Sequence, residues 1–414
     1  MLRFALSPTG DMTLSDLRIA IINFIVAQQR GEPFLVRMDD TQKAHNIEGK
    51  DTEFMQILEK FSLRHDQVYH QSEHQSIHQT LALRLLEEKK AFVCTCTDTQ
   101  SITCSGTCAQ MREDSYSRLK AEGTPFVIRL KAPKESISFT DTIFGEQRTA
   151  PKETGEPVIL SSDVSPTALF ASACDDMLSN ITTFIRHARH LGNTPREIQI
   201  KTALGYAQQT AYAHLPDIEN TPSLKQLFEE GYIPDTIINY LVLLSNPESE
   251  HAFFTLPEAI AWFDLEQIPQ TAAVFDMAML RRLNREHLLK MDERTLSLLF
   301  GFADADIGKL AKVYLETDHA ATVTELEACI RPIFSPKVYE GEMGKRMEIL
   351  KNIIWEAPMF EAYEAFEAYL AKESRLQGDA LQMPLQQLLT GTTEGPEPAV
   401  IYPHIKSYLL EVIS

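Results

Sequence analysis

Hydrophobic and polar residues follow the order strand, turn, helix, strand over the first forty positions. The short apolar start at Arg3-Phe4-Ala5 predicts a buried parallel strand, and residues 7–10 supply the Ser, Pro, Thr and Gly of a turn. Apolar residues then recur at helical spacing from Leu14 to Val26, and Phe34–Met38 is a second short apolar run. This order predicts the beginning of a doubly wound α/β domain, whose ligand crevice lies at the carboxyl ends of the strands.

The pattern changes further along the chain. Residues 46–91 predict helix, whereas the runs 125–130, 136–139 and 158–160 alternate in the manner of strands. From Ser179 the pattern returns to helix and strand, and from about Gly231 it is helical to the end. An α/β half followed by an all-helical half predicts separate domains.

The length and composition are those of a globular protein. With 414 residues, of which 44% are hydrophobic, the chain is long enough for two or three packed domains. The longest early apolar run, Ile19–Val26, is far shorter than the roughly 20 residues of a membrane span. Asp11 and Asp16 interrupt anything that resembles a signal peptide. We therefore expect a cytoplasmic protein that does not bind membranes.

The formal net charge of −19 limits the surface available to a nucleic acid, because an acidic chain repels phosphate backbones. Clusters of Lys and Arg are sparse. One predicted helix carries Arg281, Arg282 and Arg285, which are the candidates for contact with a nucleic acid. The alternative is that these arginines form an ordinary solvated helix face.

The turn and helix start at residues 7–16 have the layout of a phosphate site without its usual residues. A strand, a glycine turn and a helix N-terminus together favour anion binding. Here Thr13, Ser15 and Asp16 line that place. None of them carries positive charge or permits the closest backbone approach.

Four of the six cysteines lie between residues 94 and 108. Cys94 and Cys96 form C-x-C, and Cys104 and Cys108 form C-x₃-C, which is enough sulfur for a closed tetrahedral zinc site. Gly106 allows a turn between the last two. Reduced thiols without a metal are the alternative, because the spacing alone names no partner for the sulfurs.

Four histidines recur at near-helical spacing, at positions 65, 70, 74 and 78. They are interleaved with Gln and Ser, which predicts an exposed helix face. We expect these imidazoles to be solvated rather than to bind a metal.

Short motifs recur in a fixed order along nearly the whole chain. Arg3–Gly10 resembles R-F-A-P-S-P-T-G, and Arg37–Thr41 resembles R-I-E-D-T. The later motifs are Gln71-Ser72-Glu73, Pro166-Thr167, Asp175-Asp176, Asn193-Thr194-Pro195-Arg196, Ala213-His214-Leu215-Pro216, Glu230–Pro234, Asn239-Tyr240-Leu241 and Leu389-Thr390-Gly391. In this order they resemble the glutamyl-tRNA synthetases, which are class I aminoacyl-tRNA ligases.

The resemblance implies an architecture and a reaction. A Rossmann catalytic-like domain would span residues 1–230, interrupted at about 72–182 by a zinc-bearing insert that meets the tRNA acceptor end. A helical stem-contact domain at 231–300 and a helical anticodon-binding-like domain at 301–414 would follow. In the family, ATP with Mg²⁺ activates the glutamate carboxylate, and the terminal hydroxyl of tRNA attacks the adenylate.

The family's ATP motifs are degraded. Where the family has L-H-I-G, this chain has Met12-Thr13-Leu14-Ser15, so a neutral hydroxyl replaces the histidine and a side chain replaces the glycine. The K-L-S-K-R loop is missing, because an acidic link at 217–222 leads directly from the His214-Leu215-Pro216 motif to Ser223. Ala188 stands where the resemblance expects the acid that holds the ATP ribose.

The amino-acid pocket is better preserved. The resemblance assigns Arg3, Ser7 and Arg186 to the two carboxylates of glutamate, places Ala5 beside them, and gives Asp39 to the ammonium group. Ala168 stands where the family has a pocket tyrosine, and Cys104 takes a tyrosine position in the zinc motif. The alternative for Arg3 and Arg186 is a buried ion-pair network with Asp39, Asp175 or Asp176.

These observations favour a family member that has lost standard ATP-dependent glutamate activation. Such a protein would act by binding tRNA, a partner synthetase or a small carboxylate such as glutamate. The alternative is an active or specialised glutamate–tRNA ligase, which would need ATP and Mg²⁺.

Overall fold

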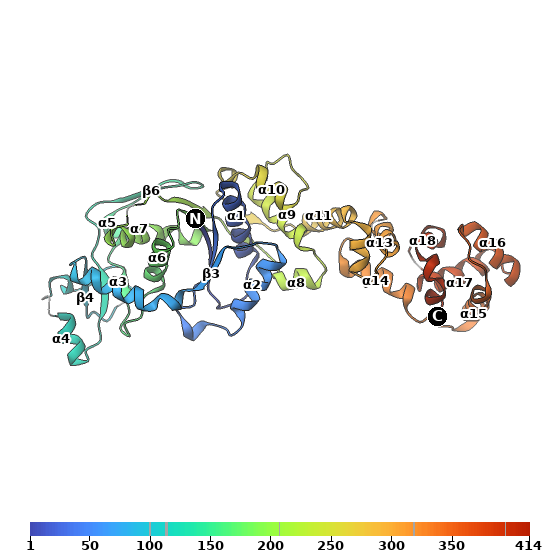
Figure 1. Ribbon diagram of the computed structural model, residues 1–414, viewed down its shortest axis with the longest axis horizontal. Helices are drawn as coiled ribbons and strands as arrows, with labels where there is room; N and C mark the ends of the chain where they lie inside the picture. The colour runs from blue at the N-terminus through green and yellow to red at the C-terminus, as the bar shows by residue number, and fades with distance from the viewer. Residues whose placement is uncertain (99–100, 112–114, 207, 318, 394) are drawn as a thin grey trace. The chain divides into compact units, whose positions relative to one another are not determined.

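The chain folds into two compact units in the computed structural model, which describes residues 1–98, 101–111, 115–206, 208–317, 319–393 and 395–414 (Figure 1). One unit comprises residues 1–222 and 241–275, and the other comprises residues 223–240 and 276–414. The boundary predicted at residue 230 lies within the segment 223–240 of the second unit. The three-domain division stays a prediction.

A seven-stranded sheet forms the centre of the first unit, in the order β3-β2-β1-β9-β10-β6-β7. Six of its strands are parallel: β1 (Leu2–Leu6), β2 (Phe34–Met38), β3 (Gln67–His70), β6 (Ile137–Asp141), β9 (Thr183–His187) and β10 (Ala211–Leu215). The register pairs Leu2 with Phe34 and Leu6 with Met38. The predicted doubly wound core is confirmed.

Helix α1 (Leu14–Arg30) follows β1 and is buried from Leu14 to Ala27, so it is a core helix. Its first turn is closed by Thr13, and it ends at Gly31, whose φ of 61° lies in the left-handed region that glycine adopts without strain. Strand β2 lies on one side of β1 and β9 on the other. The carboxyl ends of β1 and β9 therefore flank the point where the strand order reverses, which is where α/β sheets bind ligands.

The segment between β3 and β9 contributes to two sheets. A separate antiparallel sheet contains β4 (Ala91–Cys94), β5 (Val127–Leu130) and β8 (Val158–Leu160). The hairpin of β6 (Ile137–Asp141) and β7 (Gly145–Thr149) instead joins the central sheet, where β6 pairs with β10. The helices of this segment are α3 (Gln75–Glu87), α4 (Ser115–Glu122), α5 (Pro151–Thr154) and α6 (Ala168–Leu178).

Two sequence expectations were wrong in detail. Residues 46–91 are not all helical, because β3 lies between α2 (Lys50–Lys60) and α3. The region after Gly231 is not entirely helical either, since β12 (Ala273–Val274) pairs with β11 (Ile218–Glu219). Both strands are short and carry little apolar alternation.

The remaining helices complete the first unit and form the second. Helix α7 (Thr194–Ala203) and α10 (Leu256–Trp262) belong to the first unit, and α9 (Pro234–Ser245) contributes residues to both. The second unit contains α8 (Leu224–Glu229), α11 (Met277–Lys290), α12 (Glu293–Leu298), α13 (Asp306–Glu316), α14 (Val323–Phe334), α15 (Gly341–Glu356), α16 (Tyr363–Ser374), α17 (Asp379–Thr390), α18 (Pro398–Ile405) and α19 (Leu409–Val412).

The second unit has a continuous apolar core that includes Leu310, Leu326, Phe366 and Tyr402. Helices α12 and α13 approach closely at Gly308, where a Cβ would lie 1.9 Å from the carbonyl oxygen of Glu293. Only glycine permits this contact. None of the helices in the described parts of the chain has the length and apolar character needed to cross a bilayer.

Candidate active-site cleft

A cleft of about 450 Å³ opens at the carboxyl ends of β1, β2 and β9. All five residues assigned to the substrate by resemblance line it: Arg3, Ala5, Ser7, Asp39 and Arg186. Ala168, at the position of the expected tyrosine, lines it too. The structure therefore brings these candidates together around one cavity.

Arg3 and Arg37 share the buried carboxylate of Asp176. Arg3 Nε donates to Oδ1 of Asp176 at 3.0 Å, and Arg37 NH1 donates to the same oxygen at 2.8 Å. Burial alone would raise the pKa of Asp176, but the charges of the two arginines hold it well below its ordinary value. Arg37 also pairs with Asp39 at 2.5 Å. Arg3 thus lies in a buried ion-pair network, which was the alternative to substrate binding that the sequence analysis gave for this residue.

Arg186 pairs with Glu197, a residue that the sequence reasoning missed. Its NH1 donates to Oε1 of Glu197 at 2.8 Å, and its NH2 donates to Thr194 Oγ1 at 2.7 Å. Burial alone would lower the pKa of Arg186, but the charge of Glu197 raises it above the ordinary value. Glu197 lies on the helix that follows the Arg186 strand, and no local pattern signals the pairing.

A hydrogen bond from Arg186 to His214 fixes the orientation of the Arg186 guanidinium. Nε2 of His214 accepts from Arg186 Nε at 3.0 Å, and its Nδ1 lies 2.6 Å from Oδ2 of Asp141. His214 and Asp141 are almost completely buried. Burial lowers the pKa of His214, so the ring is neutral and bears its proton on Nδ1. The sequence analysis placed His214 only within the motif at residues 213–216 and predicted no role for its side chain.

The start of α1 caps itself. Thr13 Oγ1 accepts from Asp16 N at 3.1 Å, while Oδ2 of Asp16 accepts from Thr13 N at 2.9 Å. This reciprocal pair is a capping box, which satisfies two of the backbone N–H groups at the helix start, those of Thr13 and Asp16. The residues that replace the ATP motif therefore have a local structural role.

The same residues also bond across the end of the sheet. Asp16 Oδ1 lies 2.7 Å from His187 Nε2, and His187 Nδ1 lies 2.9 Å from Asp217 Oδ1. Ser15 Oγ accepts from the backbone N–H of Ile218 at 3.1 Å. Burial would raise the pKa of Asp16, but hydrogen bonds from His187 and Thr13 outweigh it and lower the pKa.

The link after β10 is short. The chain reaches α8 from β10 through residues 216–223, and two of these form β11. Arg18 donates to the carbonyl of Pro216, which holds the link against α1. Lys225, the first lysine beyond the link, is on α8 with its side chain 81% exposed.

The cleft lining carries no excess of positive charge. Its described residues include four arginines, at positions 3, 37, 186 and 189, and four carboxylates, at positions 11, 16, 39 and 197. Ala188 stands at the position where the resemblance expects an acid that binds the ATP ribose. It is partly exposed in a short 3₁₀ turn (Ala188–Asn193) after β9.

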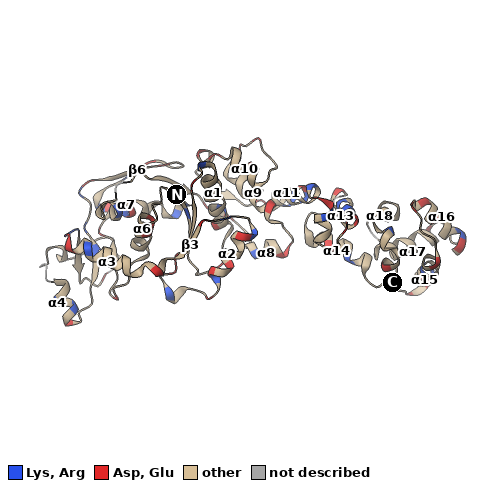
Figure 2. Cartoon of the chain, viewed as in Figure 1, with Lys and Arg blue, Asp and Glu red and all other residues tan. Residues whose placement is uncertain are grey.

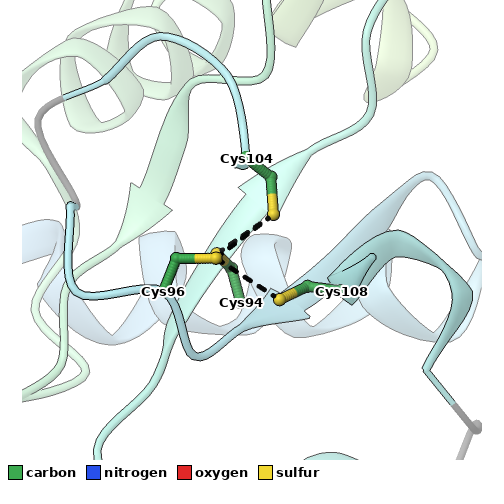
Figure 3. A group of neighbouring side chains, drawn as sticks. All are labelled: Cys94, Cys96, Cys104 and Cys108. Atoms are coloured by element: carbon green, nitrogen blue, oxygen red, sulfur yellow. Dashed lines mark hydrogen bonds between the residues drawn. The ribbon is translucent and has the colours of Figure 1, made fainter. Parts of the chain in front are cut away.

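The four clustered cysteines point toward one another beside β4 (Figure 3). Sγ of Cys96 lies 3.6 Å from that of Cys104 and 3.7 Å from that of Cys108, and Cys94 lies 3.6 Å from Cys104. A tetrahedral zinc site with Zn–S bonds of about 2.3 Å separates its sulfurs by about 3.8 Å. The cluster can therefore hold zinc with little rearrangement.

The surroundings of the cluster fit a metal site. A Cβ on Gly106 would lie 3.3 Å from Cys96 Sγ, which is tighter than most such contacts. The backbone N–H of Cys104 donates to Oε2 of Glu156 at 2.9 Å, which fixes the backbone at this cysteine. The sequence could not identify that partner.

The histidine series is not a uniformly solvated face. His78 is completely buried, and its Nε2 lies 2.7 Å from Oδ1 of Asp175. His74 Nδ1 lies 2.9 Å from the same oxygen, and Gln71 donates to the other oxygen at 3.0 Å. The expectation of solvation was wrong for His78, because its helix packs against α6.

The three arginines of α11 have different surroundings. Arg281 pairs with Glu325 at 2.5 Å, and Arg285 donates to the carbonyl of Leu315 at 2.6 Å. Arg282 is exposed. Basic and acidic residues are interspersed along the chain (Figure 2).

Comparisons with known proteins agree with this geometry. Residues 1–282 match the family model of the tRNA synthetases class I (E and Q), catalytic domain. The chain is 53% identical to glutamate–tRNA ligase 2 of Sulfurovum sp. (strain NBC37-1) and 42% identical to glutamate–tRNA ligase 2 of Sulfurimonas denitrificans, with both chains covered in full. The first of these alignments runs over 431 residues, more than this chain contains.

The fold also matches a solved structure. A crystal structure of a glutamate tRNA ligase from Elizabethkingia meningosepticum, in complex with its amino acid, superposes with a TM-score of 0.78. It is 22% identical and covers 99% of this chain and 97% of its own. At that identity the likeness supports the fold alone.

Proposed function

The chain belongs to the glutamyl-tRNA synthetase family, and from this premise we propose that it does not activate glutamate with ATP by the standard route and acts by binding tRNA. Glutamate–tRNA ligases, by their name, join an amino acid to tRNA. In this proposal the protein still binds tRNA but does not carry out the adenylation step. A partner synthetase stays a prediction of the sequence.

The bridge from Asp16 through His187 to Asp217 carries the proposal. It links α1, the end of β9 and the link after β10, with distances of 2.7 and 2.9 Å. These three places surround the point where an α/β sheet binds a nucleotide. A triphosphate seated there would have to break the bridge and lie beside two carboxylates.

Transition-state electrostatics give the second argument. Phosphoryl chemistry depends on donors and cations placed where charge develops, and removal of one such donor costs about 10²–10³ in rate. Thr13 is occupied in the capping box, and the short link after β10 contains no lysine. Losing a histidine donor and a lysine together would lower the rate by several orders of magnitude.

The parts that would meet tRNA are better preserved than the nucleotide seat. The four thiols of Cys94, Cys96, Cys104 and Cys108 fit a structural zinc, which would stabilise the acceptor-end insert. Arg282 on α11 is exposed and available to phosphate. Arg3 and Ser7 remain at the cleft to take a small carboxylate.

An active ligase is the second candidate. The full-length 53% identity to a protein named glutamate–tRNA ligase 2 favours it. Such an enzyme would need to open the Asp16–His187 bridge and recruit a cation from elsewhere in the chain.

Glutamate-dependent exchange of pyrophosphate into ATP separates the two candidates, when measured with and without tRNA. The proposal expects no exchange above background, together with a measurable complex between the protein and tRNA. Exchange at a thousandth of the rate of an ordinary synthetase would reject it in favour of the ligase.

A further inference from the structure

Two imidazoles meet one buried carboxylate between α3 and α6. His74 directly precedes α3 and His78 lies in its first turn, so the two residues are four positions apart on one helix face. Nε2 of His78 lies 2.7 Å from Oδ1 of Asp175 on α6, and Nδ1 of His74 lies 2.9 Å from the same oxygen. The three ligand atoms all lie within 4.8 Å of one another. Side chains from two helices therefore converge on one point.

The negative charge of Asp175 has no lysine or arginine paired with it in the described part of the chain. Arg3 and Arg37 pair with the neighbouring Asp176 instead. Burial would raise the pKa of Asp175, but the hydrogen bond from His78 and nearby positive charge lower it, so the carboxylate is ionised at neutral pH. Buried charges in proteins are paired or coordinate a metal, and a divalent cation would compensate this one.

Neighbouring side chains hold the possible ligands in place. Nε2 of Gln71 donates to Oδ2 of Asp175 at 3.0 Å, which orients the carboxylate and leaves Oδ1 facing the two rings. The ring of Tyr69 packs against that of His74, with centroids 4.9 Å apart. Hydrogen bonds and packing of this kind fix the orientation of ligands in metal sites.

We propose that His74, His78 and Asp175 bind a divalent transition-metal ion, in a second metal site that is separate from the four thiols. Imidazole nitrogens suit ions such as Zn²⁺, Co²⁺ and Ni²⁺, whereas Mg²⁺ and Ca²⁺ take oxygen ligands. The ion would join the start of α3 to α6. This site goes beyond the proposed function, because neither tRNA binding nor ATP chemistry requires it.

The distances fit such an ion. Ligand atoms about 2.1 Å from a metal and at right angles to one another lie about 3.0 Å apart, close to the two nitrogen–oxygen distances at Asp175. The side chain of His74 is 30% exposed, so one edge of the site is open to solvent. Three protein ligands and an open edge leave room for water. We therefore expect this ion to exchange more readily than zinc in the closed four-thiolate site.

Titration of the full chain with Co²⁺ tests the proposal. The protein is first dialysed without chelator until it retains only the zinc of the thiol site, and binding is then followed by calorimetry and visible absorption. One Co²⁺ should bind per chain without a thiolate charge-transfer band, because the ligands are nitrogen and oxygen. Bound Co²⁺ should also raise the melting temperature, since it binds the folded chain.

Two variants and a control locate the bound ion. His74→Ala and Asp175→Asn should each weaken Co²⁺ binding at least about tenfold, since even the loss of a partner outside the ligand set costs 10–100-fold in metal affinity. His74 is partly exposed, so its replacement disturbs the fold less than a change at the buried Asp175. His45→Ala removes an exposed imidazole outside the cluster and should bind Co²⁺ as the parent does.

Parent protein that binds no Co²⁺ beside its zinc would overturn the proposal, and so would bound Co²⁺ that shows a thiolate band. Both results come from the parent chain, so they decide the question even where a variant does not fold. Co²⁺ affinity that is unchanged in a folded His74→Ala would place the ion elsewhere and also overturn the proposal. Pyrophosphate exchange measures a different property, so the proposed function is tested separately.

Discussion

Oδ1 of Asp16 lies 2.7 Å from Nε2 of His187, although 171 positions separate the two residues in the chain. Asp16 directly follows the Met12–Ser15 segment, His187 directly precedes Ala188, and Asp217, the second partner of His187, lies in the link where the resemblance expects a lysine-containing loop. Here Asp16, His187 and Asp217 contact one another, so the start of α1, the end of β9 and the link after β10 form one packed junction.

A double-mutant cycle on Asp16 and His187 should measure this junction. Asp16→Ala and His187→Ala should each destabilise the protein, and their interaction energy should be about 1–3 kcal/mol, because the pair is buried and hydrogen-bonded. Urea unfolding of the parent, both single variants and the double variant gives the value. The exposed pair Lys225 and Glu229, 3.8 Å apart, is the control and should couple by less than about 0.5 kcal/mol. If the interaction energy of Asp16 and His187 is no larger than that of this surface pair, their contact does not stabilise the fold and the prediction is wrong.

Asp176→Asn should destabilise the first unit in a pH-dependent manner. Arg3 and Arg37 lower the pKa of Asp176 far below its ordinary value, against the effect of burial. Its ionised form therefore stabilises the fold above about pH 4, and this contribution is lost as the pH falls toward the lowered pKa. We expect a loss of about 3–5 kcal/mol at pH 7, because Arg3 loses the carboxylate it pairs with and Arg37 loses one of two.

Unfolding at pH 7 and at pH 3 checks this expectation. The difference in unfolding free energy between parent and Asp176→Asn should shrink at the lower pH. The Glu135→Gln control, at an exposed position, should differ little from parent at both. A difference for Asp176→Asn that grows as the pH falls would contradict the expected direction.

Elemental analysis should find about one zinc per chain. Cys94→Ser and Cys108→Ser should each lose it, because a four-thiolate site needs all its ligands. Cys329→Ser, at a half-buried cysteine outside the cluster, should retain it. Parent protein purified without chelators that contains no metal would support the alternative of free thiols.

Neutralising Arg282 should weaken tRNA binding and reduce its dependence on salt. For Arg282→Ala the slope of log affinity against log salt should fall by about one unit, since one phosphate contact is lost. Arg281→Ala should lose less affinity, because Arg281 already pairs with Glu325. Arg331→Ala, exposed on α14, serves as the control. If tRNA affinity is unchanged after Arg281, Arg282 and Arg285 are neutralised together, this face of α11 does not contact tRNA.

Local patterns were sufficient for much of the fold. The apolar runs at Arg3-Phe4-Ala5 and Phe34–Met38 became β1 and β2, because buried parallel strands require continuous apolar residues. The edge strand Gln67–His70 lacks that signal and was missed. The pairing of β6 with β10 joins Asp141 to Tyr212, and no local pattern encodes a contact between segments so far apart in the chain.

The candidate site shows the same division. Motif order brought Arg3, Ser7 and Arg186 together correctly around one cleft, and cysteine spacing was enough to predict the thiol cluster. Glu197 escaped notice, because its role depends on how α7 packs beside β9. From the sequence, Asp16 was interpreted only as a residue without positive charge at the expected phosphate site. Its partner His187 could not be identified, because the two residues meet only in three dimensions.

The central claim is that the nucleotide seat no longer supports adenylation, and pyrophosphate exchange measures that step most directly. The protein should be assayed with glutamate, ATP and Mg²⁺, with and without tRNA, beside the Sulfurovum relative as a positive control. We expect no glutamate-dependent exchange from this chain under either condition. Turnover of about 0.01 s⁻¹ or faster, a thousandth of a typical enzyme rate, would contradict the account.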